Sequence, residues 1–374
     1  MQQYFNEHLP LKPRNAKTWR SGSLFLKAIA MTTLAAVSIS AMSQSANPAA
    51  SGVIANSLMQ YDKPDRAEKI LEAASKEGTL TLYTAFRPQD LPLIVGPFEA
   101  KYGIKVKAWR SGSNNVTQRV VREAAGKKPE VDVIMMPASE MEAVYREKLL
   151  QPVTSPLIKD LIPSATVPHK QWSTVFMNVT VHSYNTQLIK KEDLPKSYND
   201  LLDPKWKGKL SVEADDSDWL AETVMKMGEE KGIALFKEIA RKNAVSVRKG
   251  HTLLANLVAS GEVPMALTLY NYKIEQMKNS GAPVDWFSLD PTIARPNANG
   301  VARSAPHPHA ALLFQDFELS EGQVILGKRD FIPTSTKVPS TLNKMPLTFA
   351  NPKTTLDDGH KWNKVYDEIF NRKG

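Results

Sequence analysis

A strand–helix–strand–helix–strand alternation restricts the possible folds of this chain more than any other feature. From Thr79 to Met136, short runs rich in β-branched and apolar residues alternate with amphipathic stretches. Parallel strands need a crossover connection, usually a helix, so this order predicts a parallel sheet with right-handed crossovers. The expected strands cover residues 79–84, 104–109 and 131–136, and the expected helices cover 66–75, 88–102 and 116–125.

A second α/β unit is expected after a break that contains four prolines between residues 152 and 168. It should contain strands over 175–184, 209–213, 263–268 and 283–287, and helices over 219–227, 232–241, 252–260 and 272–280. Residues 299–302 and helices over 308–318 and 320–327 are expected to return to the first unit, before a closing helix over 361–371. A length of 374 residues suits two packed lobes.

The N-terminus has the three parts of a secretory signal. A basic region runs to Lys27, thirteen uncharged residues follow over 28–40, and small residues surround Ser43. The apolar run is shorter than the ~20 residues that cross a bilayer. We therefore expect a signal peptide over residues 1–43, a flexible leader over 44–60 and a periplasmic mature protein. The alternative is a buried or amphipathic helix.

Charge and cysteine content exclude several classes of function. The net charge is +9, but the first 45 residues carry five Lys or Arg against one Glu. The remaining excess is modest and dispersed, so no nucleic-acid partner is expected. The absence of cysteine excludes disulfides, thiolate metal sites, cysteine nucleophiles and a lipid-modified N-terminal cysteine.

Three loops follow the expected strands of the first unit, at Thr84–Arg87, Arg110–Asn115 and Pro137–Glu140. In open parallel sheets, ligands bind beyond the C-terminal ends of the strands and beside helix N-termini. These loops therefore supply the first expected ligand contacts, which are Thr84, Arg87, Ser111, Ser113, Asn114 and Ser139.

Several segments appear in the order and spacing of a known family. They are FEAKYGIKV (98–106), RSGS (110–113), VDVI (131–134), LPKSYNDLLDPKWKGKL (194–210), GEVPMA (261–266), APHPHAALLF (305–314) and LSEGQ (319–323). On these segments, the chain from about Thr79 to Pro339 resembles the periplasmic ferric-iron-type solute-binding proteins of ABC transporters.

The resemblance implies a bilobed periplasmic-binding-protein fold, in which two α/β lobes joined by hinge strands close on a ligand between them. Lobe 1 is expected to comprise residues 61–175 and 290–374, and lobe 2 residues 176–289. The implied function is capture of a small ligand for an inner-membrane ABC permease. We expect a monomer without a cofactor.

The resemblance also indicates where a ferric-iron ligand set would lie. Iron binders of the family commonly use adjacent tyrosines after the strand that corresponds here to 265–268. Aligned in this way, one tyrosine falls on Tyr272 and its neighbour on Asn271, with Tyr270 one residue away. Arg87 stands where iron binders often have a histidine, and Pro137–Ser139 where a carboxylate is often found. No bound metal is therefore expected, and ferric iron is the alternative cargo.

The main hypothesis is a small organic anion such as a carboxylate or phosphonate. The guanidinium of Arg87 matches such groups, and Ser111–Asn114 precede a helix whose free N–H groups favour an anion. Tyr270 and Tyr272 offer hydroxyls or a stacking surface. The simpler interpretations are a surface salt bridge for Arg87 and ordinary N-capping for Ser111–Asn114.

Acidic and histidine residues add further candidates. Asp216 and Asp218 can bind a cation or the ammonium of a zwitterion, although aspartate is also favoured at a helix N-terminus. His251 begins a helix that is expected to face the cleft. His307 and His309 lack the i, i+4 spacing of a helical metal site, which favours capping or surface roles.

Two other classes compete with an importer component. An enzyme can reuse a bilobed fold, but the sequence has no nucleophile elbow, Walker loop or His–Glu pair at metal spacing. We therefore expect no catalysis. A sensor that docks on a receptor when loaded is the other alternative, and a neighbouring permease gene would favour the importer.

Overall fold

The computed structural model describes residues 58–340 and 345–371, so the expected signal peptide and most of the expected leader lie outside the described residues. The described residues all belong to one compact unit. Within the described residues, no helix is both long and apolar enough to cross a membrane.

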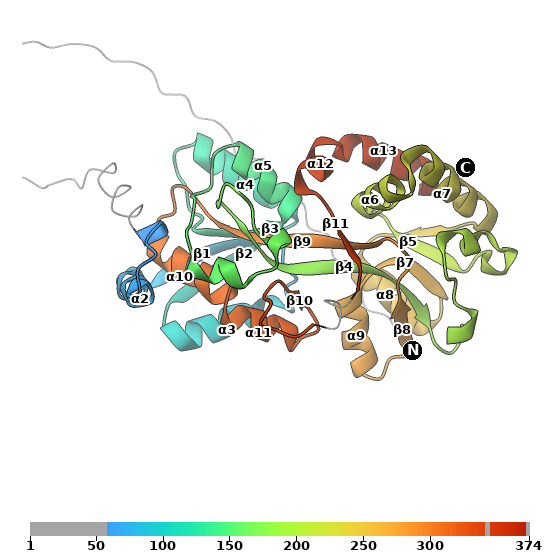
Figure 1. Cartoon of the computed structure of the whole chain (residues 1–374), viewed down its shortest axis with the longest axis horizontal. Coiled ribbons are helices and arrows are strands. Elements are labelled where there is room, and N and C mark those ends of the chain that lie inside the picture. The colour runs from blue at the N-terminus through green and yellow to red at the C-terminus, as the bar shows by residue number, and fades with distance from the viewer. Residues whose placement is uncertain (1–57, 341–344, 372–374) are drawn as a thin grey trace, which may run out of the picture. The chain divides into compact units, whose positions relative to one another are not determined.

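Helices and strands alternate in the predicted α/β order (Figure 1). The strands are β1 Thr79–Thr84, β2 Lys105–Arg110, β3 Val133–Pro137, β4 Ser173–Asn185, β5 Leu210–Glu213, β6 Ser246–Arg248, β7 Met265–Tyr270, β8 Val284–Phe287, β9 Thr292–Val301, β10 Ile332–Pro333 and β11 Leu347–Phe349. The helices are α2 Arg66–Glu77, α3 Leu91–Tyr102, α4 Ser113–Ala125, α5 Ala138–Arg146, α6 Ser217–Met227, α7 Glu229–Asn243, α8 His251–Ser260, α9 Asn271–Asn279, α10 Pro308–Glu318, α11 Glu321–Gly327, α12 Pro352–Asp357 and α13 Gly359–Phe370.

The strands form one curled sheet in which β4 and β9 connect two halves. The order β2-β1-β3-β9-β4-β7-β5-β6 places parallel strands at both ends and antiparallel pairs in the middle. β4 pairs with β9 over Ser173–Val179 and with β7 over Thr180–Tyr184. β4 and β9 therefore lie side by side between the two groups of helices (Figure 1). This is the arrangement expected of hinge strands.

Each half of the sheet has its own apolar core. In the first half, Phe98 of α3 packs on Phe314 and Phe317 of α10, and these rings join the core beneath β1. In the second half, Trp219 of α6 packs on Tyr198 and on Phe236 of α7. Burial of such aromatic rings supplies much of the stability of each half.

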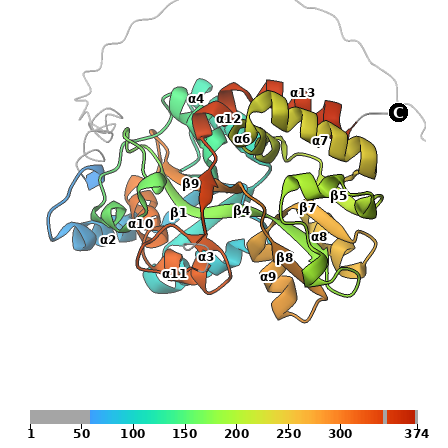
Figure 2. The ribbon, with the colours of Figure 1, turned by 45° about the vertical axis from the view of Figure 1, so that its right-hand side comes forward.

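Of the C-terminal helices, α10 packs against the first half of the sheet, but α13 packs against the second. α10 packs on α2 and α3 of the first half, in line with the expected return. α13 instead packs on α6 and α7 (Figure 2). Its Trp362 and Tyr366 belong to the core of the second half. The expected lobe 1 over 290–374 therefore does not describe the packing of α13. The amphipathic pattern of this helix specifies that one face is buried, but not which core receives it.

Two boundaries differ from the expected ones and matter for the site. The segment 299–302, which was expected to return to the first unit, falls at the end of the ten-residue β9, Thr292–Val301. The expected loop Pro137–Glu140 is the start of α5, with Pro137 as its N-cap. Both changes place side chains of these segments on rigid elements.

Glu318 of α10 is a buried carboxyl group within the first core. Its Oε1 has no hydrogen-bond partner among the described residues, and Asn299 donates to its Oε2. Burial raises the pKa of Glu318 from 4.5 to about 8, against the opposing effect of Asn299. The folded protein therefore holds this proton at neutral pH, whereas the unfolded chain releases it.

Glu318→Gln should consequently flatten the dependence of stability on pH. In the wild type, this group stabilises the fold fully below pH 4.5, and the contribution is lost as pH rises to about 8. The expected slope is at most about 1.4 kcal/mol per pH unit. Thermal melts of both proteins between these limits measure it. Equal slopes would show that Glu318 does not titrate as described.

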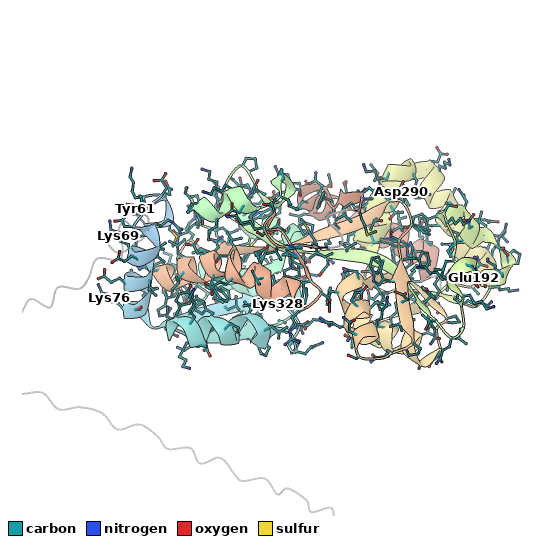
Figure 3. The ribbon with its side chains drawn as sticks, turned by 60° about the horizontal axis from the view of Figure 1, so that its bottom comes forward. Tyr61, Lys69, Lys76, Glu192, Asp290 and Lys328 are labelled. Carbon is teal, nitrogen blue, oxygen red and sulfur yellow. The ribbon has the colours of Figure 1, made fainter. Side chains whose placement is uncertain are left out.

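Lys76 on the exposed side of α2 is a suitable control position for substitutions. Figure 3 shows Lys69 and Lys76 on this helix, beside Tyr61. Lys76 pairs with Glu72 at 2.7 Å, and both side chains are more than two-thirds exposed. Solvent screens such pairs, so Lys76→Ala should leave stability and binding nearly unchanged.

Candidate functional site

A cavity of about 960 Å³ lies between the two halves of the sheet, and we call it the Arg295 cavity. α4 and α5 contribute one wall, α6 contributes a second, and α12 and α13 close a third. Arg295 of β9 lies between these walls. The volume suits a small organic molecule, which fits pockets of ~300–1,000 Å³.

The N-termini of four helices meet at this cavity. Its lining includes the first residue of α4 (Ser113), α6 (Ser217) and α13 (Gly359), and the second residue of α5 (Ser139). None of the four N-cap residues caps its helix through a side-chain hydrogen bond. The first N–H groups of a helix have no partner within it, and the helix dipole adds partial positive charge there. Such ends favour an anionic group.

Arg295 is the cation of the cavity and is held by acidic residues from both halves. Its Nε lies 2.9 Å from Asp218 of α6, and its guanidinium lies 3.8 Å from Glu140 of α5. The phenol of Tyr270 also interacts with the guanidinium. Burial alone would lower the pKa of Arg295, but Asp218, Tyr270 and Glu140 raise it, so the side chain stays charged.

Glu140 accepts hydrogen bonds from serine hydroxyls at two of the helix N-termini. The Ser113 hydroxyl donates to Glu140 Oε1 at 2.6 Å, and the Ser139 hydroxyl donates to Oε2 at 2.5 Å. The backbone N–H groups of the first turns of α4 and α5 are not used by these bonds. A ligand anion can therefore approach the backbone donors while Glu140 keeps the two hydroxyls oriented.

Carboxylates outnumber cations around the cavity. Asp215, Asp218, Glu140 and Asp367 all line it, against the guanidinium of Arg295 and the imidazole of His360. Burial raises the pKa of Asp218, nearby Asp216 adds to this, and Arg295 opposes it. This set of acids can accept hydrogen bonds from an ammonium group, so the cavity offers complementary partners for both signs of charge.

Asp216 and His251 lie behind the cavity wall together with Glu213. His251 Nε2 is 3.1 Å from both carboxylate oxygens of Asp216. Glu213 accepts the N–H of Gly250 at 2.7 Å and the N–H of Asp215 at 2.6 Å. Despite burial, Asp216 and then Glu213 raise the pKa of His251. One ligand atom from each of Glu213, Asp216 and His251 lies within 4.8 Å of the others, which is metal-ligand spacing. The hydrogen bonds above, however, already satisfy these groups.

The two tyrosines lie in a stack of rings that runs into the first core. Tyr270 stacks on His251 at 4.4 Å and lies 6.0 Å from Tyr272, which stacks on Phe331 at 4.3 Å. The guanidinium of Arg87 lies over the ring of Tyr272, with its carbon atom 4.8 Å from the ring centroid. Burial raises the pKa of Tyr272 to about 12 against the effect of Arg87, and burial also raises the pKa of Tyr270.

The remaining predicted residues have structural partners. Arg87 forms a salt bridge with Asp90 at 2.5 Å, which matches the simpler interpretation of this residue. The buried Thr84 accepts the N–H of Phe86, and Ser111 accepts from the Asn115 side chain. His307 and His309 pair with Asp132 and Glu77 at the start of α10. The structure thus brings Ser113, Asn114, Ser139 and Asp218 into the Arg295 cavity, and the other predicted contacts lie outside its lining.

Sequence reasoning missed the residue at the centre of the cavity. Arg295 sits among Ile293, Ala294 and Pro296, and a lone arginine within an apolar strand was the available signal. Asn178 lies directly opposite it in the β4–β9 ladder, with an unpartnered Oδ1. Tyr366, which donates to the Glu213 carbonyl at 2.5 Å, comes from a helix whose position no local pattern predicts.

Removing the hydroxyl of Tyr270 or of Tyr272 should affect ligand affinity differently. Tyr270→Phe removes the hydroxyl that contacts Arg295, so ligand affinity should fall by about 5-fold, the cost of ~1 kcal/mol for one hydrogen bond. Tyr272→Phe should leave affinity within about 2-fold, since its ring packing is retained. Calorimetric titration of both variants measures this. A greater loss from Tyr272→Phe would place the ligand at the ring stack.

A family model described as bacterial extracellular solute-binding protein matches residues 128–349. Iron uptake protein A1 of Synechocystis sp. is 24% identical over 309 residues, which are 77% of this chain and 85% of that protein. A putative 2-aminoethylphosphonate-binding periplasmic protein of Salmonella typhimurium is 26% identical over 286 residues, 73% of this chain and 81% of that protein.

Among solved structures, iron-bound HitA from Pseudomonas aeruginosa superposes with a TM-score of 0.68 at 21% identity. The match covers 78% of this chain and 99% of that one. At this level of identity the likeness shows the fold alone. It confirms the α/β fold with two lobes and hinge strands that the sequence predicted.

Proposed function

Because the chain belongs to the bacterial extracellular solute-binding proteins, as its sequence predicted, we propose that it holds a small organic anion in the Arg295 cavity. The protein is the solute-binding component of an ABC importer, which binds a small ligand and functions with a membrane permease. The chemical class of the ligand and its place in the cleft are the proposal.

The convergence of four helix N-termini that lack side-chain caps with one half-buried arginine supports this proposal. The first turns of α4 and α5 line the cavity and lack side-chain caps, and Arg295 adds a full positive charge. Dipoles fixed in this way bind an anion at little cost in reorganisation. Arg87, the arginine that the sequence favoured, is committed to Asp90 and Tyr272.

The carboxylates of the cavity favour a ligand that also carries an ammonium group. A simple dianion would be repelled by Asp215, Asp218, Glu140 and Asp367, whereas an aminoalkyl phosphonate or amino acid has a group for each sign. A relative that is 26% identical bears the name of a 2-aminoethylphosphonate binder. We accordingly favour a zwitterionic phosphonate or carboxylate.

Ferric iron is the second candidate, because a relative that is 25% identical is named an Fe(3+)-binding periplasmic protein. The carboxylates near His251 are the feature of this chain that supports it. Against it, Arg295 places a positive charge close to these acids, beside Asp218 and near His251. The organic ligand is therefore the better match.

The remaining parts of the proposal concern location and mode of action. We infer export through residues 1–43, action as a monomer in the periplasm, and binding without catalysis. The basic and apolar pattern of the N-terminus and the binding-protein names of the relatives support these inferences.

A thermal-shift panel on the mature protein tests the ligand class. 2-Aminoethylphosphonate, methylphosphonate, citrate, glycine and ferric citrate are compared at equal concentration. A zwitterionic phosphonate should raise the melting temperature by several degrees, since ligand at ~100 Kd adds ~2.7 kcal/mol. Lys76→Ala should respond like the wild type. Stabilisation by ferric citrate, without any response to citrate or the phosphonates, would contradict the proposal.

A further inference from the structure

Glu140 places a carboxylate at the end of the Arg295 cavity where the proposed function puts the anionic group of the ligand. Its side chain lines the cavity and is 17% exposed. Oε1 lies 2.6 Å from the hydroxyl of Ser113 on α4 and 3.8 Å from the guanidinium of Arg295. Oε2 lies 2.5 Å from the hydroxyl of Ser139 on α5. An anion that reaches Arg295 and these helix ends therefore comes close to a fixed negative charge.

The hydrogen bonds to Glu140 determine what the two serines can offer to a ligand. A hydroxyl has one proton, and the hydroxyls of Ser113 and Ser139 both donate theirs to Glu140. Each serine oxygen keeps its lone pairs, so it presents a hydrogen-bond acceptor to the cavity. A carboxylate has about four acceptor positions, so Glu140 can accept further hydrogen bonds beside those from the serines. Glu140, Ser113 and Ser139 thus form a group of acceptors next to one cation, Arg295.

An anionic group that keeps a proton matches both the acceptors and the cation. A singly protonated phosphonate or phosphate monoester has one O–H that can donate to Glu140, and its other oxygens can face Arg295. Phosphate-type groups lose their second proton near pH ~6, so this form is present close to neutral pH. A carboxylate or sulfonate anion has no proton, so one of its oxygens would face the Glu140 carboxylate as acceptor against acceptor. Sites built for a hydrogen bond reject analogues that lack the matching group.

We propose that Glu140 is a specificity-determining residue, which selects a phosphonate or phosphate group that carries a proton and rejects carboxylates and sulfonates of similar size. The inference rests on the proposed function, since it concerns the anionic end of the same cavity. Asp218 holds Nε of Arg295 at 2.9 Å, so the other guanidinium N–H groups can bind the charge of the ligand while Glu140 binds its proton. The ligand class is thereby narrowed to the zwitterions that contain phosphorus.

Calorimetric titration of the mature protein at a pH of about 6 tests this with 2-aminoethylphosphonate, 2-aminoethyl phosphate, 2-aminoethanesulfonate and 3-aminopropanoate. All four carry an ammonium group, but only the two phosphorus compounds keep a proton on the anionic group at this pH. The wild type should bind at least one of them at least about 10-fold more tightly than the sulfonate and the carboxylate, as expected for one hydrogen bond to a charged group. The tighter of the two distinguishes a phosphonate from a phosphate ester as the source of the group.

Glu140→Ala removes the acceptor and frees both serine hydroxyls to donate to the ligand. The sulfonate should then gain affinity and the phosphorus compounds should lose it, so that the gap shrinks to within about 3-fold. Loss of the negative charge alone would widen the gap instead, because the phosphorus compounds carry more negative charge than the sulfonate. Glu140→Gln keeps the volume of the side chain and should narrow the gap in the same direction.

Glu147→Ala is the matched control, because Glu147 is exposed and lies at the other end of α5. It should keep the preference of the wild type. A preference that survives both Glu140→Ala and Glu140→Gln would overturn the inference, as would equal binding of the phosphonate and the sulfonate by the wild type. In both cases the proposed function would stand if Arg295→Met still weakened binding. If none of the four compounds bound to the wild type, the proposed function and this inference would fail together.

Discussion

Arg295→Met is expected to weaken ligand binding by about 100-fold, close to 3 kcal/mol. The guanidinium is the cation that accompanies four helix N-termini in the cavity, and methionine keeps much of its volume without its charge. The change also leaves Asp218 unpaired, with only 13% of that side chain exposed. The free energy of unfolding should fall by roughly 2 kcal/mol, because an unpaired buried charge is costly. Calorimetric titration and urea unfolding measure the two effects separately.

A double variant distinguishes lost binding from lost folding. Asp218→Asn removes the charge that Arg295→Met leaves unpaired, so the two changes together should be more stable than Arg295→Met alone. Affinity should stay low in the double variant, because the cation is still missing. Recovery of affinity together with stability would show that Arg295 acts only by holding the fold.

Trp219→Ala is expected to lower the free energy of unfolding by about 4 kcal/mol, the cost of emptying a large aromatic site in a core. Trp219 is 2% exposed and packs on Phe236 at 5.4 Å between ring centroids. It follows Asp218 on α6, so loss of this anchor also frees the helix end that faces the cavity. Urea unfolding followed by circular dichroism measures the change in midpoint.

Met225→Ala on the same helix is the control for this substitution. Met225 is 56% exposed, and its replacement should change stability by less than about 0.5 kcal/mol. Equal effects of the two variants would show that α6 is not anchored by its buried face.

Most of the fold follows from patterns that act locally. Ile70 and Ala74 are one turn apart on the buried face of α2, and Gly78 ends the helix at a φ of 64°. Alternation, helix periodicity and turn glycines therefore predicted most of the elements and their order. α13 shows the limit, because periodicity specifies that Trp362 is buried but not against which core.

The candidate site was predicted in part, for a physical reason. Loops after parallel strands meet at one edge of the sheet, so Ser113, Asn114 and Ser139 share a cavity as expected. The sequence does not show which of Arg87 and Arg295 is available to a ligand. The tertiary fold shows that Asp90 neutralises Arg87, whereas β9 carries Arg295 into the cleft. The family-based expectation for Tyr272 likewise omitted Phe331, which holds its ring in the core.

A crystal structure of the mature protein with the best ligand of the thermal-shift panel tests the central claim most directly. The account predicts the anionic group beside Arg295 and the first turns of α4 and α5, with an ammonium group near Asp215 or Asp218. Crystals grown with ferric citrate should show no anomalous iron peak at Tyr270 or Tyr272. An iron peak between these tyrosines, with the Arg295 cavity unchanged, would contradict the account.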